Sequence, residues 1–91
     1  MSGATRKREE VYDQVVSAVA QVLAIPRESI RPDSRYLEDL GATSLDRATL
    51  YMVLEEDLKL TLPESTAAAL VTIDQTVDFI LQNLPTGREP G

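Results

Sequence analysis

Apolar side chains recur every three or four residues in several segments of this 91-residue chain. This spacing places them on one face of an α-helix. The clearest such segment runs from Glu9 to Ala24 and ends before Pro26. Its apolar residues are Val11, Tyr12, Val15, Val16, Val19, Val22 and Leu23. No segment alternates apolar and polar residues over the length of a strand, so the sequence predicts an all-α fold.

Three further helices are predicted. One starts at Thr43 or Ser44 and runs to about Lys59, a short one covers Ser65 to Leu70, and the last opens at a capping-box pattern at Thr72 to Gln75. The apolar side of the last helix holds Ile73, Val77, Ile80, Leu81 and Leu84. We expect a four-helix bundle with three long helices and a short third one.

A long loop separates the first two helices. Residues 25–43 contain Pro26, Pro32 and Gly41 and lack sustained periodicity. The residues expected to pin this loop to the core are Ile30, Tyr36, Leu37 and Leu40. The folded domain should span residues 8–84, with flexible tails at residues 1–7 and 85–91, where small, charged and helix-breaking residues gather.

Composition restricts the possible chemistry. The chain has neither Cys nor His, which excludes disulfides, thiol nucleophiles, the usual zinc sites and the commonest general base. No base, nucleophile and orienting group converge, so we expect no enzyme and no metal site. The formal charge of −6 disfavours nucleic acid and favours basic partners. Because no signal-like or membrane-spanning apolar run occurs, we expect a cytoplasmic protein without membrane insertion.

The second helix carries two apolar faces. At about 100° per residue, Leu50, Leu54 and Leu58 share the core face, and Leu45 and Met52 lie nearly opposite. Residues 36–64 also contain seven acidic side chains against two basic ones. Exposed apolar residues bordered by charge are typical of a partner surface, although single exposed apolar residues are also common without any function. The acidic run is itself consistent with an ordinary solvated face.

Ser44 stands where the loop meets the second helix. Free backbone N–H groups and the helix dipole favour an anion at this position, so a phosphodiester on Ser44 would be stabilised. Ser at such a junction commonly serves only as a helix cap. Thr43 and Asp46 could form a capping box of their own, which would release Ser44 from that role.

The segment Leu37-Glu38-Asp39-Leu40-Gly41-Ala42-Thr43-Ser44-Leu45-Asp46 closely resembles the acyl carrier proteins of fatty acid and polyketide synthesis. The resemblance covers about residues 8–84. It continues through Leu54-Glu55-Glu56-Asp57 and Leu62-Pro63-Glu64 to the last helix at Thr72 to Ile80.

This resemblance implies that Ser44 receives 4′-phosphopantetheine from coenzyme A through a phosphopantetheinyl transferase. The thiol of that group would carry acyl intermediates as thioesters for fatty acid, lipid or polyketide biosynthesis. The partner-binding residues would be Leu45, Asp46, Met52, Glu55 and Glu56, and the acyl pocket between the second and third helices would be lined by Leu54, Leu62 and Leu70. Expected partners are acyl-transferring, ketosynthase-type or acyl-activating enzymes with basic docking patches, each meeting a monomeric, free-standing carrier.

The sequence departs from the family pattern near the site. Thr43 replaces the usual Asp, Thr49 stands where Glu is common, and Arg47 adds a positive charge. These changes leave fewer acidic side chains near Ser44 than the family pattern has, and they favour a specialised carrier with a narrower set of partners. Two alternatives stay open: an aminoacyl or peptidyl carrier of nonribosomal synthesis, and an unmodified helical interaction module.

Overall fold

The computed structural model describes residues 3–83, and this part of the chain is helical, without β-strands. Helix α1 spans Gly3–Leu23, α2 spans Ser44–Leu58, α3 spans Glu64–Ala69 and α4 spans Ile73–Asn83. A short 3-10 helix, η1, covers Arg27–Ser29 in the long loop. The predicted bundle with three long helices and a short third one is confirmed. None of the helices in the described range is long and apolar enough to cross a membrane.

Helix α1 starts earlier than the sequence predicted. It begins at Gly3 and not near Glu9, so residues 3–7, which we assigned to the N-terminal tail, are helical. The charged residues of this stretch are good helix formers. The guanidinium of Arg8 also donates to Asp74 at 2.8 Å and to Asp78 at 2.6 Å, which links this end of α1 to α4. Leu84 and the predicted tail at 85–91 lie outside the described residues.

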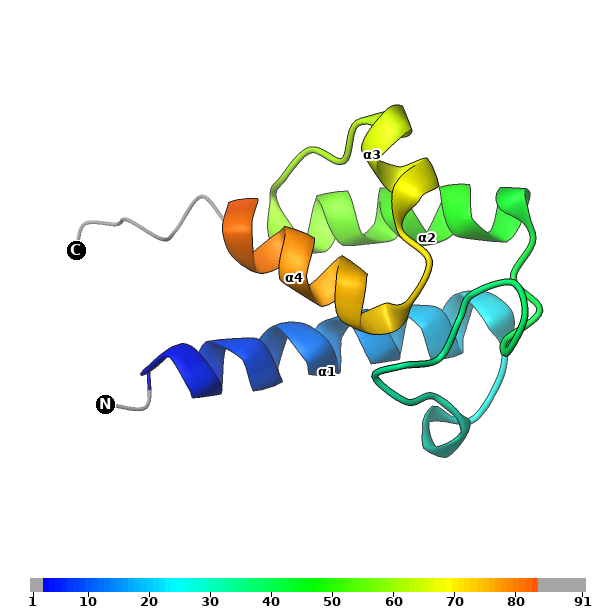
Figure 1. The fold of residues 1–91 in the computed structure, drawn as a ribbon, viewed down its shortest axis with the longest axis horizontal. Helices are drawn as coiled ribbons and strands as arrows, with labels where there is room; N and C mark the ends of the chain where they lie inside the picture. Colours follow the sequence, from blue (N-terminus) through cyan, green and yellow to red (C-terminus); the bar gives the residue numbers. More distant parts are fainter. Residues whose placement is uncertain (1–2, 84–91) are drawn as a thin grey trace.

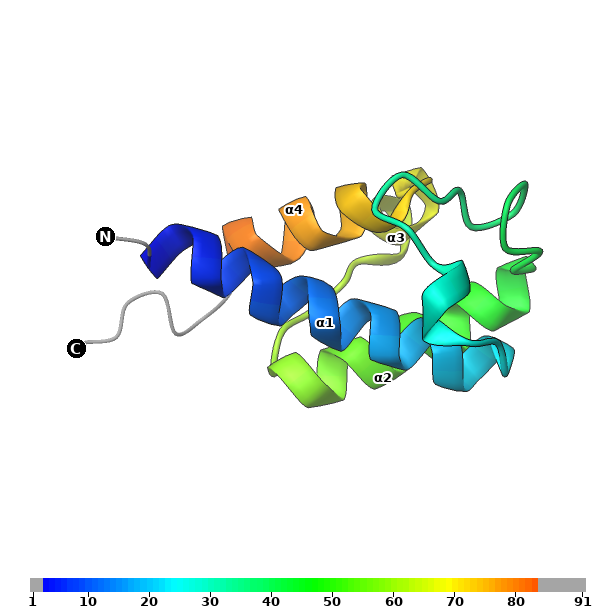
Figure 2. The same cartoon turned by 90° about the horizontal axis from the view of Figure 1, so that it is seen from below.

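Helix α1 lies against both α2 and α4, and the start of α1 and the end of α4 lie at the same end of the bundle (Figure 1, Figure 2). The apolar faces of these three helices meet in one core, to which the long loop and the residues around α3 contribute. The buried core residues are Val11, Val15, Val16, Ala18, Val19, Ile30, Tyr36, Ala42, Leu50, Tyr51, Leu54, Leu62, Leu70, Ile73, Val77 and Ile80.

The segment between α1 and α2 closes the opposite end of the bundle (Figure 1). Its backbone is tied to the link between α3 and α4: the Tyr36 N–H donates to the Val71 carbonyl at 2.9 Å, and the Ile73 N–H donates to the Ser34 carbonyl at 3.1 Å. The prediction that Leu37 also pins the loop to the core is wrong, because Leu37 is 66% exposed. The neighbouring Tyr36, which was also predicted to pin the loop, lies in the core with no exposed surface.

Candidate functional site

Ser44 is the first residue of α2, and its side chain is exposed. Thr43 is the N-cap: its Oγ1 accepts the Asp46 N–H at 3.2 Å, and the Asp46 carboxylate accepts the Thr43 N–H at 3.1 Å. The predicted capping box is confirmed. Gly41, at a φ of +69°, supplies the left-handed turn that leads into this junction. Because Thr43 caps the helix, the Ser44 hydroxyl is left for other chemistry.

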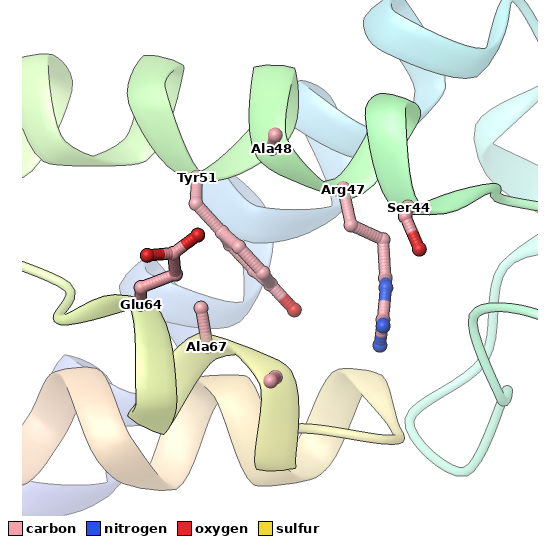
Figure 3. A pocket seen from close by; sticks show the side chains of 7 residues that line it. Ser44, Arg47, Ala48, Tyr51, Glu64 and Ala67 are labelled. Atoms are coloured by element: carbon pink, nitrogen blue, oxygen red, sulfur yellow. The ribbon is translucent and has the colours of Figure 1, made fainter.

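The start of α2 suits a phosphate ester. The capping box uses the Asp46 N–H, and the Arg47 N–H donates to the Thr43 carbonyl at 3.0 Å. The N–H groups of Ser44 and Leu45 therefore lie at the positive end of the helix dipole, where anions are stabilised. Arg47 follows Ser44 by three residues, so its guanidinium projects from the same face of the helix (Figure 3). The residues present thus fit a phosphopantetheine group on Ser44.

An apolar and acidic strip runs along the outer face of α2. Leu45 is 76% exposed and Met52 is 62% exposed, so the prediction that both lie away from the core is confirmed. Glu56 is exposed beside them. We call Leu45, Met52 and Glu56 the docking strip, because exposed apolar side chains bordered by charge suit contact with another protein.

Asp46 and Glu55 have partners within the fold. Asp46 belongs to the capping box, and Glu55 is half-buried. The Glu55 carboxylate accepts the Leu62 N–H at 2.7 Å, which holds the loop between α2 and α3. The sequence did not predict this bond, since Leu62 lies seven residues away in an irregular segment. A partner enzyme would therefore meet a Glu55 that is already engaged.

A groove of about 250 Å³ separates α2 from α3 and opens beside Ser44 (Figure 3). Its walls are Ser44, Arg47, Ala48 and Tyr51 on α2, and Glu64, Ala67 and Ala68 on α3. The four residues from α2 have the spacing of one helical face, which is a signal that the sequence offered. The Arg47 guanidinium also donates to the Leu70 carbonyl at 3.1 Å and so links α2 to the end of α3.

The three leucines expected to line the acyl pocket take other positions. Leu54 is fully buried, and Leu62 and Leu70 are 7% exposed, all within the main core. None of them is among the residues that line the groove. The prediction that an acyl pocket lies between the second and third helices stays a prediction, and the three leucines named for it belong to the core, with Leu62 in the loop before α3 and Leu70 directly after α3.

Two buried polar side chains, Tyr36 and Thr76, lie in the core next to Tyr51. The Tyr36 hydroxyl and Thr76 Oγ1 are 2.5 Å apart, and both residues are fully buried. The ring of Tyr36 meets the ring of Tyr51 edge to face, with centroids 6.2 Å apart. Burial raises the pKa of both phenols above the ordinary value, so both are neutral at physiological pH.

Comparison with known proteins agrees with this geometry. A family model described as "Phosphopantetheine attachment site" matches residues 13–80, a range that contains Ser44 and the groove. An acyl carrier protein of Cyanidioschyzon merolae is 41% identical over 75 residues, which cover 82% of each chain. An acyl carrier protein of Campylobacter jejuni subsp. doylei is 39% identical over 69 residues, which cover 76% of this chain and 90% of the relative. The chain therefore belongs to the phosphopantetheine-binding acyl carrier protein family.

Proposed function

We propose that this protein carries acyl groups as thioesters on a 4′-phosphopantetheine attached to Ser44 Oγ. The observation that carries this proposal is the position of Ser44: it is exposed at the first residue of α2, and the Thr43–Asp46 box caps the helix in its place. In the modification, the Ser44 Oγ forms a bond to the phosphorus nearer the pantetheine, and 3′,5′-adenosine diphosphate leaves. The hydroxyl proton goes to a base of the transferase.

The prosthetic group supplies a thiol, which a chain without Cys lacks. The chain itself positions that group. The N–H groups at the start of α2 would hold the phosphate, and the nearby groove would offer the attached chain a place out of water. The protein is thus a carrier and not a catalyst, and it works with a phosphopantetheinyl transferase and with biosynthetic enzymes.

The docking strip is the surface that we propose these enzymes contact. A basic patch on the partner would pair with Glu56 while Leu45 and Met52 bury apolar area against it. Exposed ion pairs contribute only about 0.2–1 kcal/mol each, so such docking is transient. We propose that a monomeric carrier makes these contacts with acyl-transferring, ketosynthase-type or acyl-activating enzymes.

The test is the intact mass of the protein after incubation with coenzyme A and a promiscuous phosphopantetheinyl transferase. We expect one pantetheinyl adduct on the wild type and none on Ser44→Ala. Ser65→Ala is the matched control, because Ser65 is also exposed in the first turn of a helix, α3, and its variant should keep the adduct. An adduct that persists in Ser44→Ala, or no adduct on the wild type with several transferases, would contradict the proposal. The second result would favour an unmodified interaction module.

The kind of cargo is tested on the modified protein. Mass analysis of the thioester-bound groups recovered from cells should find acyl groups without an α-amino nitrogen. Aminoacyl or peptidyl groups in their place would identify a carrier of nonribosomal synthesis.

A further inference from the structure

Arg47 is a half-buried cation that makes no ion pair within residues 3–83. The arginines that do have an acidic side chain within 4.0 Å are Arg8, Arg27 and Arg35. The carboxylate of the adjacent Asp46 accepts the Thr43 N–H in the capping box. A charge that is partly removed from water without a counter-ion is unfavourable, so Arg47 is suited to bind an anion.

The Arg47 side chain lies beside the hydroxyl of Ser44. The two residues are three positions apart in α2, and such residues are neighbours on the surface of a helix. Figure 3 shows both side chains leaving α2 on the side that faces α3. A negative group bonded to Ser44 Oγ would therefore have Arg47 as its neighbouring cation.

The end of α3 already orients the guanidinium. Arg47 Nη1 donates to the carbonyl of Leu70 at 3.1 Å, and Leu70 is the C-cap of α3. Nε and Nη2 form another edge of the planar group, which suits a second acceptor. A pair of N–H donors on one edge matches two oxygens of a phosphate, so the guanidinium is oriented before the anion is attached.

We propose that Arg47 is the counter-ion of the phosphate on Ser44 and that this ion pair holds the attached group on the α3 side of α2. This inference rests on the proposed function, because modification of Ser44 supplies the phosphate. The ion pair neutralises a cation that the described part of the unmodified chain leaves without one. Since the same guanidinium binds Leu70, the pair also links Ser44 to the end of α3, and modification should stabilise the fold.

The first test compares the Tm of the modified and unmodified protein, with intact mass to verify each form. Modification should raise the Tm of the wild type, and this rise should be about 4 °C larger than in Arg47→Gln. Lys59→Gln is the matched control, because it removes a positive charge from the other end of α2, about 22 Å from Ser44 along the helix. Exposed charges that far apart are screened at physiological salt, so Lys59→Gln should keep the wild-type rise.

A purely structural role for Arg47 predicts a different result. If Arg47 only held Leu70, then Arg47→Gln would lower the Tm of both forms equally, and the rise on modification would match that of the wild type. That outcome would overturn the inference. Arg47→Lys keeps the charge but loses the planar edge of donors, so it should recover part of the rise. A rise no larger in Arg47→Lys than in Arg47→Gln would contradict an ion pair.

Phosphorus NMR of the modified protein is the second test. The phosphodiester resonance should differ between the wild type and Arg47→Gln, because loss of the cation changes the electronic environment of the phosphorus. It should stay unchanged in Lys59→Gln, and the resonances of all three proteins should coincide in urea. Coincident resonances in the folded wild type and Arg47→Gln would overturn the inference and leave the carrier function intact. Absence of any adduct on the wild type would overturn both proposals.

Discussion

The bond between Glu55 and Leu62 gives the sharpest stability prediction for this fold. The carboxylate accepts the Leu62 N–H at 2.7 Å, and the side chain of Leu62 is buried in the core. Hydrogen bonds to charged groups contribute about 1.5–3 kcal/mol, and removal of the acceptor leaves a partly buried N–H unpaired. We therefore expect Glu55→Ala to lower the free energy of unfolding by about 1.5–3 kcal/mol. Glu55→Gln keeps a neutral acceptor and should lose about half as much.

Urea unfolding followed by circular dichroism measures these changes. In thermal unfolding, each kcal/mol of lost stability lowers the Tm of a domain of this size by about 4–8 °C, so Glu55→Ala should lower the Tm by roughly 6–24 °C. Glu56→Ala is the matched control, because Glu56 is the next residue of the same helix but is exposed. Its stability should change by less than about 0.5 kcal/mol. Equal stabilities for Glu55→Ala and Glu56→Ala would refute the reasoning.

Three further predictions concern the cap, the core and alkaline pH. Thr43→Ala removes the side-chain half of the capping box and should lower the free energy of unfolding by about 1 kcal/mol in urea titrations, whereas an unchanged value would mean that Asp46 alone caps α2. Leu54→Ala should lower the free energy of unfolding by about 2–5 kcal/mol in the same urea titrations, because Leu54 is fully buried; a loss below about 1 kcal/mol would show that the core closes around the space left by the side chain. Burial raises the pKa of Tyr36 and Tyr51 above the ordinary 10.0, so ionisation above pH 10 favours the unfolded chain. Their contribution to stability should be constant below pH 10 and fall as pH rises above it, and pH-independent unfolding between pH 9 and 11 would contradict this.

Local sequence signals accounted for much of the fold. Helical periodicity located α2, α3 and α4 within one or two residues, because amphipathic spacing and prolines act within a few residues of chain. The capping box at Thr43 and Asp46 could be predicted for the same reason. The start of α1 was missed because its first turns carry no apolar face, and the ion pairs of Arg8 with Asp74 and Asp78 join residues far apart in the chain.

In the candidate site too, local sequence signals placed some residues and tertiary packing placed the others. Ser44, Leu45 and Met52 could be placed from the sequence, since a helix wheel and a cap fix where their side chains point. The lining of the groove could not be placed, because it depends on how α3 packs against α2, and Leu54, Leu62 and Leu70 lie in the core and not in the groove.

The sequence by itself thus determined the helices, the cap that frees Ser44 and the exposed face of α2. These features depend on dihedral preferences and on spacing within one turn of a helix. Only the tertiary structure decided that Glu55 holds the loop at Leu62, that Arg47 reaches the end of α3, and that the rings of Tyr36 and Tyr51 meet edge to face. Such contacts depend on how separate elements pack, and side-chain donors find or lose their acceptors only when the core closes.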